Sequence, residues 1–274
     1  MNLSLNFSTC PNDTFMFYAL VHGLLSDKYN FNVYMADIED LNLLALEAKP
    51  DITKLSYGAY PLLARHYQLL DSGSALGKGV GPLLISKETI PFDEVKHKRI
   101  ALPGEHTTAH LLFNRVFPDV MDKRFYLFSQ IEDAILSNEV DAGVIIHESR
   151  FTYQSKGLTK LMDLGNEWEK ISGLPTPLGG IVIRRSLPDD VKHDINRLLR
   201  ESVAYAFRNP KNTMGFVSHY AQDLSTEVMR NHINLYVNDF SLTLDHLGRR
   251  AIIQLISSYR PLYNFDESDI FVYE

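Results

Sequence analysis

The sequence predicts an α/β protein folded into two lobes, and three observations support this fold class. Short apolar segments typical of strands alternate with amphipathic segments typical of helices as far as Arg184. Two segments rich in glycine and proline, "DSGSALGKGVGPLLIS" and "GLPTPLGGIVIRR", each lead into a strand, as chain crossings between lobes do. From about Pro188 onward the pattern is typical of one helix after another.

The bulk composition is that of a globular protein of ordinary polarity. The 274 residues, 45% hydrophobic and 22% charged, suffice for one large domain or two modest ones. The net charge of −7 argues against general nucleic-acid binding, which needs a basic surface. The single cysteine, Cys10, has no partner for an internal disulfide, and its neighbours favour a small buried hydrophobe over a nucleophile. No signal peptide or membrane-spanning segment is visible, so we expect a cytoplasmic protein without membrane insertion.

The individual elements follow from the spacing of apolar residues. The first strand is predicted at residues 3–8, where Leu3, Leu5 and Phe7 alternate with polar residues. Further strands are predicted at residues 31–38, 51–56, 67–71, 82–86, 99–102, 124–128, 142–147, 158–163 and 180–184. Helices are predicted at residues 13–25, 41–48, 58–65, 107–117 and 129–138. This alternation predicts that each lobe holds a mainly parallel sheet flanked by helices.

The two crossings define the expected domains. If the chain passes between lobes at both, residues 1–83 and 180–274 form a discontinuous first lobe, and residues 84–179 form an inserted second lobe. One continuous sheet is the alternative arrangement. Two lobes joined in this way enclose a cleft, which is a common place for a ligand. Trp168, shortly before the second crossing, either lines that cleft or packs in a core.

The turn after the first strand, "STCPND", is the first candidate ligand contact. Pro11 requires the chain to turn, and Asn12 or Asp13 suits the N-cap of the next helix. In α/β sheets the turns after the carboxyl ends of strands face the ligand. Ser8, Thr9 and Asn12 are therefore candidate ligand contacts, and a plain helix cap is the alternative.

Two further turns have the same design. In "LPGEHTTA", Thr107 and Thr108 place hydroxyl and backbone N–H groups at the positive end of a helix, which suits a carboxylate or a phosphate. A helix cap without a ligand is the alternative. In "KLSYG", Lys54 and Ser56 end a strand and either face the ligand or simply terminate the strand.

His147 is the clearest candidate for acid–base chemistry. It ends the apolar segment "AGVII", and a histidine at such an edge is suited to act as a general base near neutral pH. Taken by itself, a histidine at a strand end is more often structural. His106 and His110 lack an intervening glutamate and a third ligand in register, so no metal site is expected.

The glycine-rich segment "GSALGKGVG" does not form a nucleotide-binding motif. Gly73 and Gly77 are separated by three residues, whereas a Walker loop has four residues between its glycines. No Ser–His–Asp or Cys–His arrangement is visible either. Spacing alone therefore predicts a small ligand and leaves binding and catalysis both open.

Several segments together resemble the 1,4-dihydroxy-6-naphthoate synthase family of the futalosine route to menaquinone. The resemblance rests on "STCPNDTF", "KLSYGAY", "GSALGKGVGPLL", "LPGEHTTA", "DAGVIIHE" and "LPTPLGGI", in this order along the chain. Each motif by itself is weak, whereas their order and spacing are specific. The helical part after Pro188 contributes little to the match.

The resemblance implies a two-lobed fold like that of the type II periplasmic binding proteins. The implied reaction cleaves cyclic dehypoxanthinyl futalosine, a carboxylated small molecule, to 1,4-dihydroxy-6-naphthoate and dihydroxyacetone. Neither a metal nor a redox cofactor is implied. His147 matches the family's general base. The implied substrate-binding positions are Lys54, Leu55, Ser56, Thr107 and Thr108, with Ser8 and Asn12 beside them.

Two other functions remain alternatives. Chorismate dehydratase has the same fold and acts in the same route, although "DAGVIIHE" and "GSALG" favour the synthase. A non-catalytic binding protein for a small carboxylate is the other alternative. Such a protein is normally exported, and the expected lack of a signal peptide favours an enzyme.

Overall fold

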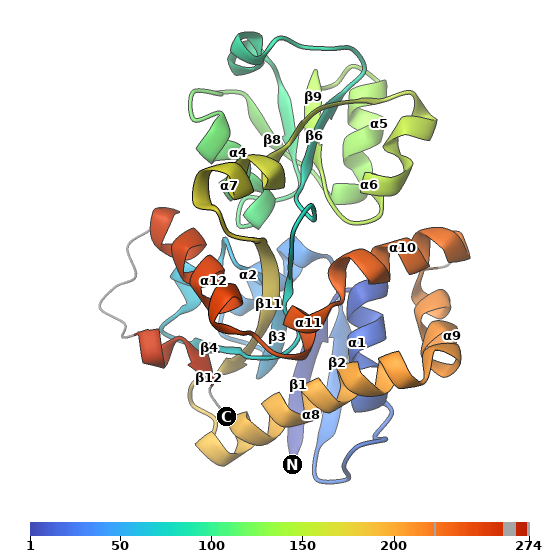
Figure 1. The fold of residues 1–274 in the computed structure, drawn as a ribbon, viewed down its shortest axis with the longest axis vertical. Coiled ribbons are helices and arrows are strands. Elements are labelled where there is room, and N and C mark those ends of the chain that lie inside the picture. Colours follow the sequence, from blue (N-terminus) through green and yellow to red (C-terminus); the bar gives the residue numbers. More distant parts are fainter. Residues whose placement is uncertain (222, 260–266, 273–274) are drawn as a thin grey trace. The chain divides into compact units, whose positions relative to one another are not determined.

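The computed structural model describes residues 1–221, 223–259 and 267–272. The chain divides into two compact units, unit 1 (residues 1–77 and 177–274) and unit 2 (residues 78–176). Each unit has its own sheet with helices packed against it (Figure 1). The divisions lie a few residues before those expected from the sequence. The reason is that the first half of the glycine-rich segment forms strand β5 (Ala75–Gly77), which pairs inside unit 1 with β11 (Thr176–Arg184).

The sheet of unit 1 has the strand order β12-β4-β11-β3-β1-β2. Its other strands are β1 (Asn2–Phe7), β2 (Asn30–Met35), β3 (Ile52–Ser56), β4 (Tyr67–Leu70) and β12 (Phe271–Val272). Strand β1 runs parallel to both β2 and β3, whereas β11 runs antiparallel to β3 and β4. The carboxyl ends of β1, β2 and β3 therefore lie along one edge of the sheet.

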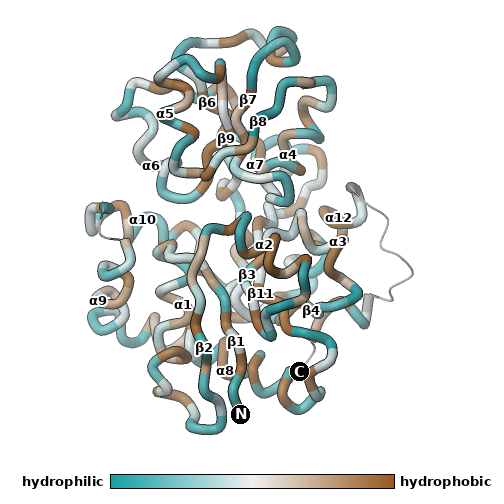
Figure 2. The backbone as a smooth tube through the Cα atoms, turned by 180° about the vertical axis from the view of Figure 1, so that it is seen from behind, coloured by the Kyte–Doolittle hydropathy of each residue, from teal (hydrophilic) through white to brown (hydrophobic). Residues whose placement is uncertain are grey.

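The helices of unit 1 include those predicted after Pro188. They are α1 (Pro11–Val21), α2 (Ile38–Leu46), α3 (Tyr60–Leu63), α8 (Asp189–Arg208), α9 (Pro210–Tyr220), α10 (Thr226–Tyr236), α11 (Asp239–Leu242) and α12 (His246–Tyr259), with a 3₁₀ turn at Glu267–Asp269. The apolar side chains of β1 pack against those of α1 and α8, and the stacked rings of Phe7 and Phe17, 4.4 Å apart, lie in this core. Apolar segments recur along the strands, and polar segments along many surface loops (Figure 2).

Unit 2 contains the smaller sheet, with the order β10-β6-β9-β7-β8. Its strands are β6 (Leu83–Ser86), β7 (Ile100–Leu102), β8 (Lys123–Phe125), β9 (Ala142–Ile145) and β10 (Thr159–Asp163). The helices are α4 (Thr108–Val116), α5 (Ile131–Leu136), α6 (Ser149–Thr152) and α7 (Leu164–Ser172), with 3₁₀ turns at Phe92–His97, Phe128–Gln130 and Tyr153–Lys156. Strand β7 is parallel to β8 and β9, and β6 is antiparallel to β9 and β10.

Both sheets contain antiparallel pairings beside the predicted parallel ones. The antiparallel pairings involve β11 in unit 1 and β6 in unit 2. Each of these strands follows a crossing. Parallel neighbours are usually joined by a crossover helix that packs on their common sheet. Strands β6 and β11 are instead entered from the other unit, so this reason for a parallel pairing is missing. Helices α6 and α7 and strands β5 and β12 were not predicted, whereas every predicted strand has a counterpart in the structure.

Both crossing segments are held by hydrogen bonds inside unit 2. Glu169 on α7 accepts from the backbone N–H of Gly79 at 2.8 Å and from the hydroxyl of Thr176 at 3.0 Å. Arg150 donates to the carbonyls of Gly79 and Gly81. One carboxylate thus joins the segment that enters unit 2 to the segment that leaves it.

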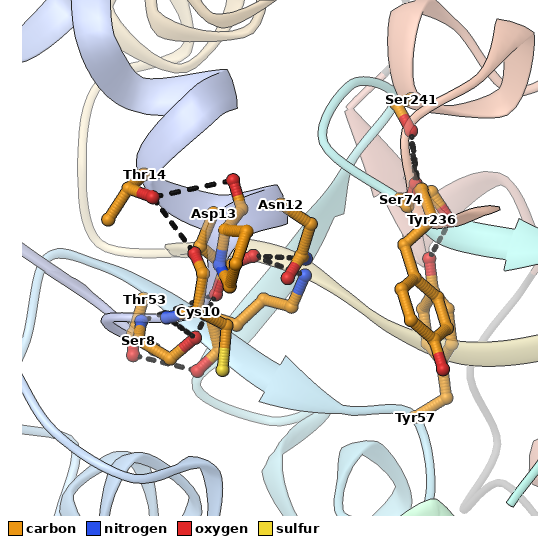
Figure 3. A network of polar contacts seen from close by, with 12 residues as sticks. Ser8, Cys10, Asn12, Asp13, Thr14, Thr53, Tyr57, Ser74, Tyr236 and Ser241 are labelled. Carbon is orange, nitrogen blue, oxygen red and sulfur yellow. Dashed lines mark hydrogen bonds and ion pairs between the residues drawn. The ribbon is translucent and has the colours of Figure 1, made fainter. Parts of the chain in front are cut away.

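Unit 1 holds its end of the first crossing in a separate network. The Tyr57 hydroxyl and Ser74 Oγ lie 2.7 Å apart, and Ser241 Oγ donates to the Ser74 carbonyl at 2.8 Å (Figure 3).

In unit 2, Trp168 is buried and its indole N–H donates to the Pro175 carbonyl, so this residue packs in a core. None of the helices in the described part of the chain is long and apolar enough to span a membrane.

Candidate functional site

The predicted site residues of unit 1 gather at the carboxyl edge formed by β1, β2 and β3. Because β1 pairs in parallel with β3 through Leu5 and Ile52, the turn after β1 and the end of β3 meet at this edge. We call Ser8, Asn12, Asp13, Lys54 and Ser56 the unit 1 edge cluster. All five side chains are buried.

A buried ion pair forms the centre of the unit 1 edge cluster. Lys54 Nζ lies 3.0 Å from Asp13 Oδ1, and the two side chains are 6% and 1% exposed. The Asp13 carboxylate also accepts from the backbone N–H and the hydroxyl of Ser8, at 3.2 and 2.7 Å, and from the Asn12 amide at 2.8 Å (Figure 3). Such a buried pair is tolerated only when the remaining hydrogen-bonding capacity is satisfied, and here several donors surround one carboxylate.

The start of α1 differs from the prediction. The N-cap is Cys10, its side chain makes no capping bond, and the helix begins at Pro11. The expectation that Asn12 or Asp13 is the N-cap was therefore wrong. Asp13 lies inside the first helical turn, beyond the N-cap position. Its carboxylate binds Lys54, 41 residues away in sequence, and does not cap the helix. Cys10 is buried, as its sequence context indicated.

The end of β3 is fixed by a side chain from α2. Asn42, fully buried, accepts from the backbone N–H of Ser56 at 2.9 Å and donates to Ser56 Oγ at 3.2 Å. This arrangement leaves the hydroxyl hydrogen of Ser56 to be donated elsewhere. The Leu55 side chain is completely buried, so a contact between Leu55 and a ligand is restricted to its main chain.

Asp37, which was not predicted as a site residue, follows β2 at the same edge. Asp37 is the N-cap of α2, and its Oδ1 accepts from the Glu39 N–H at 2.9 Å. Within the described residues its buried Oδ2 has no hydrogen-bond partner. Burial raises the pKa of Asp37 above its usual value, although backbone hydrogen bonds oppose the shift. The sequence does contain a signal for Asp37, since it is an acidic residue between a strand and a helix, as Asp13 is after the first strand.

Unit 2 carries a second edge of the same kind. Strands β7 and β9 pair in parallel, with Ile100 opposite Ala142, so the turn before α4 and the residues after β9 lie at one edge. Thr107 is the N-cap of α4. Its Oγ1 accepts from the His110 N–H at 3.2 Å and donates to the Gly104 carbonyl at 2.9 Å. Thr107 is therefore a helix cap, and the buried Thr108 is the first residue of the helix.

His147 lies at this unit 2 edge in an unusual backbone conformation. Its φ is 57°, in the left-handed region that residues other than glycine rarely adopt. The half-buried imidazole packs edge to face on Phe128, with 4.8 Å between ring centroids. Phe128 follows β8, which pairs in parallel with β7. Backbone strain of this kind is concentrated at functional sites, because the surrounding structure must maintain it.

His110, considered above with His106 as a possible metal ligand, is engaged in hydrogen bonds. Its Nδ1 lies 2.8 Å from the Glu105 carbonyl, and its Nε2 lies 2.8 Å from the Asn114 amide. Within residues 1–221, 223–259 and 267–272, no group of three or more histidine, cysteine or acidic side chains is arranged to hold a metal ion.

Comparison with known proteins gives consistent matches over most of the chain. A family model described as "Menaquinone biosynthesis" matches residues 3–260. A Thermus thermophilus protein described as 1,4-dihydroxy-6-naphtoate synthase is 42% identical over 255 residues, which is 93% of either chain. A Streptomyces coelicolor protein of the same description is 38% identical over 260 residues, covering 93% of this chain and 92% of the other.

Solved structures agree with these matches. The crystal structure of an Archaeoglobus fulgidus protein matches with a TM-score of 0.89 at 34% identity, covering 96% of this chain and 98% of that chain. A Candida albicans protein, described as having the generic periplasmic binding protein structural fold, matches with a TM-score of 0.68 at 12% identity, covering 99% and 96%. At that identity the likeness shows the fold alone, and it confirms the predicted fold class.

Proposed function

The chain belongs to the menaquinone biosynthesis family, and we propose that it is an enzyme that converts cyclic dehypoxanthinyl futalosine to 1,4-dihydroxy-6-naphthoate with release of dihydroxyacetone. The observation that carries this proposal is the similarity to two synthases over most of the chain. The left-handed His147 at the unit 2 edge supports it, because strain is maintained there in a residue suited to proton transfer.

His147 is the general base in this proposal. A neutral imidazole accepts a proton from the substrate near pH 7, and the electron pair left behind drives cleavage of a carbon–carbon bond. The three-carbon fragment departs as the remaining ring system becomes aromatic. This is a lyase reaction in which no net oxidation or reduction takes place, so the proposal requires no redox cofactor.

The predicted binding residues have different roles in this proposal. Ser56 contacts substrate directly, because Asn42 leaves its hydroxyl hydrogen available to a substrate oxygen. Thr108 and the Lys54 ammonium contact the substrate's carboxylate or its sugar-derived oxygens. Ser8 and Thr107 support these contacts indirectly, since the hydroxyl of each already donates to a protein acceptor.

The decisive experiment is incubation of the purified protein with cyclic dehypoxanthinyl futalosine. Formation of the naphthoate and dihydroxyacetone in equal amounts, followed by absorbance and mass spectrometry, is expected. A parallel reaction with chorismate tests the dehydratase alternative. Absence of product from both compounds, with retained binding, would instead establish a binding protein.

The role of His147 is tested by His147→Asn and His147→Ala. Because a positioned general base contributes about 10²–10⁴-fold, we expect turnover to fall by that amount while the dissociation constant for substrate changes little. An unchanged rate in either variant would exclude His147 as the base.

A further inference from the structure

A cavity of about 370 Å³ lies in unit 1. It is formed by α1, by the end of α8, and by α9 and α10, which pack together in unit 1 (Figure 1). None of its lining residues belongs to the unit 1 edge cluster. Its volume is in the range of small-molecule pockets.

The wall of this cavity is apolar and partly aromatic. Phe15 and Ile233 line it and are almost fully buried in a core cluster that Met214 covers. Phe207 also lines it, with its ring edge to face against Phe15 at 5.5 Å between centroids. Phe207 nevertheless remains 45% exposed. An exposed aromatic ring beside an open apolar cavity gains free energy when a ligand covers it.

Two cations line the same cavity. Lys211 comes from the first turn of α9, and Arg230 comes from α10. Both are exposed, and among the residues that the structure describes neither forms an ion pair with an acidic side chain. Among the described residues, no aspartate or glutamate lines the cavity. In a chain with a net charge of −7, this convergence of two cations on an apolar cavity favours an anionic ligand.

We propose that this cavity binds an apolar monocarboxylate. The apolar body of the ligand contacts Phe15, Phe207 and Ile233, and its carboxylate pairs with Lys211 and Arg230. The shared chemistry is one carboxylate on an apolar body, which an aromatic acid or a medium-chain fatty acid supplies. The proposal rests on the cavity and not on the proposed reaction, so either can fail without the other.

The test is isothermal titration of the full-length protein with 2-naphthoate and with octanoate. We expect at least one of them to bind, and 2-naphthamide, which has the same ring system without the charge, to bind about tenfold more weakly than 2-naphthoate. Because 2-naphthoate also resembles the product of the proposed reaction, naphthoate binding identifies an aromatic acid only where the cavity variants below weaken it. Octanoate binding identifies a fatty acid. If neither binds at millimolar concentration, the proposal is wrong.

Variants locate the binding to this cavity. The double variant Lys211→Met/Arg230→Met is expected to weaken binding about tenfold or more, because it removes both charge partners. Arg208→Met is the matched control, since Arg208 is exposed at the end of α8 and does not line the cavity. Thermal unfolding of each variant verifies folding. Equal affinity in the double variant and the control would place the ligand elsewhere and refute the proposal.

Discussion

The ion pair between Lys54 and Asp13 is expected to stabilise unit 1 strongly. Removing one partner of a buried pair leaves an uncompensated charge, which costs about 3–5 kcal/mol. Lys54→Met should therefore lower the free energy of unfolding by about this amount in urea denaturation, even though Ser8 and Asn12 still donate to the Asp13 carboxylate.

The control for this variant is Lys49→Met, which breaks an exposed pair with Glu47 whose side chains are 62% and 56% exposed. An exposed pair contributes about 0–1 kcal/mol, so this change should be small. The double variant Lys54→Met/Asp13→Asn should recover part of the loss, because the buried charge is removed as well. Equal losses in the two lysine variants would contradict the interpretation.

The left-handed backbone at His147 predicts which substitutions the fold tolerates. Asparagine adopts this conformation more readily than other residues, whereas a β-branched residue is penalised by about 1–2 kcal/mol. His147→Val should therefore unfold at lower urea concentration than His147→Asn. Indistinguishable midpoints would show that the backbone relaxes on substitution.

Individual residues divide into those that the sequence predicts and those that it does not. Ser8, Lys54, Thr107 and His147 were predicted as site residues because each follows or ends a strand, and the structure places each one at a sheet edge. Spacing along the chain does not tell which distant side chains meet, so the contact between Lys54 and Asp13 was not foreseen. The positive φ of His147 was equally invisible, because no glycine marks it.

At the scale of elements, the cap of α4 gives a quantitative prediction. Thr107→Ala should destabilise the protein by about 1 kcal/mol, and Thr107→Ser should retain most of the stability, because the serine hydroxyl also accepts from the His110 N–H. Ser225→Ala provides a comparison at α10, where Ser225 accepts from the Val228 N–H at the same distance of 3.2 Å. Denaturation curves in urea measure both effects. A negligible loss for Thr107→Ala would show that solvent replaces the cap.

Helix α8 carries a carboxylate whose ionisation stabilises unit 1. Lys28 Nζ lies 2.9 Å from Asp194, and this contact, helped by Arg197 and Tyr29, lowers the pKa of Asp194 to about 2. The depressed pKa means that the unfolded chain binds the proton more readily. The stabilisation is complete above the usual pKa of 3.8 and is lost as the pH falls toward 2.

Asp194→Asn tests this dependence. The variant should be less stable than the wild type at neutral pH, and the difference should narrow as the pH falls below about 4. Urea midpoints of both proteins over that range measure it. A difference that is independent of pH would mean that Asp194 acts through its shape and not its charge.

The elements themselves were largely predictable, since local periodicity marks them. The direction in which neighbouring strands pair was not predictable from local periodicity. Strands β6 and β11 show no sequence feature that distinguishes them from parallel strands, because pairing direction depends on the path of the chain through the other unit. The early start of α1 at Pro11 was missed for a related reason, since the side chain that suited a cap binds elsewhere.

At the scale of the molecule, the two crossings account for the division into units. Glu169 accepts from Gly79 and Thr176, so loss of its carboxylate should remove one hydrogen bond from each crossing segment. In Glu169→Ala the Gly79 amide should exchange with deuterium about tenfold faster or more, because a hydrogen bond to a charged group is lost. Exchange measured by mass spectrometry on peptides that contain Gly79 tests this.

Two variants on α7 control the Glu169 experiment. Glu169→Gln keeps an acceptor oxygen and should remain close to the wild type. Glu167→Ala removes an acidic residue from the same helix whose partner is Lys170, and it should leave exchange at Gly79 unchanged. If both alanine variants accelerate exchange equally, helix fraying and not the specific contact is responsible.

The burial of Cys10 has a practical consequence for spectroscopy. As the sole cysteine, and 7% exposed in the first turn of unit 1, it should react slowly with thiol reagents. A cysteine introduced at Met121 of unit 2, which is 89% exposed, would then accept a fluorophore selectively in the otherwise native chain. A second introduced cysteine, at Leu24 of unit 1, which is 49% exposed, would carry the other dye of a donor–acceptor pair. Energy transfer between the two dyes would report, molecule by molecule, whether substrate changes the distance between the units.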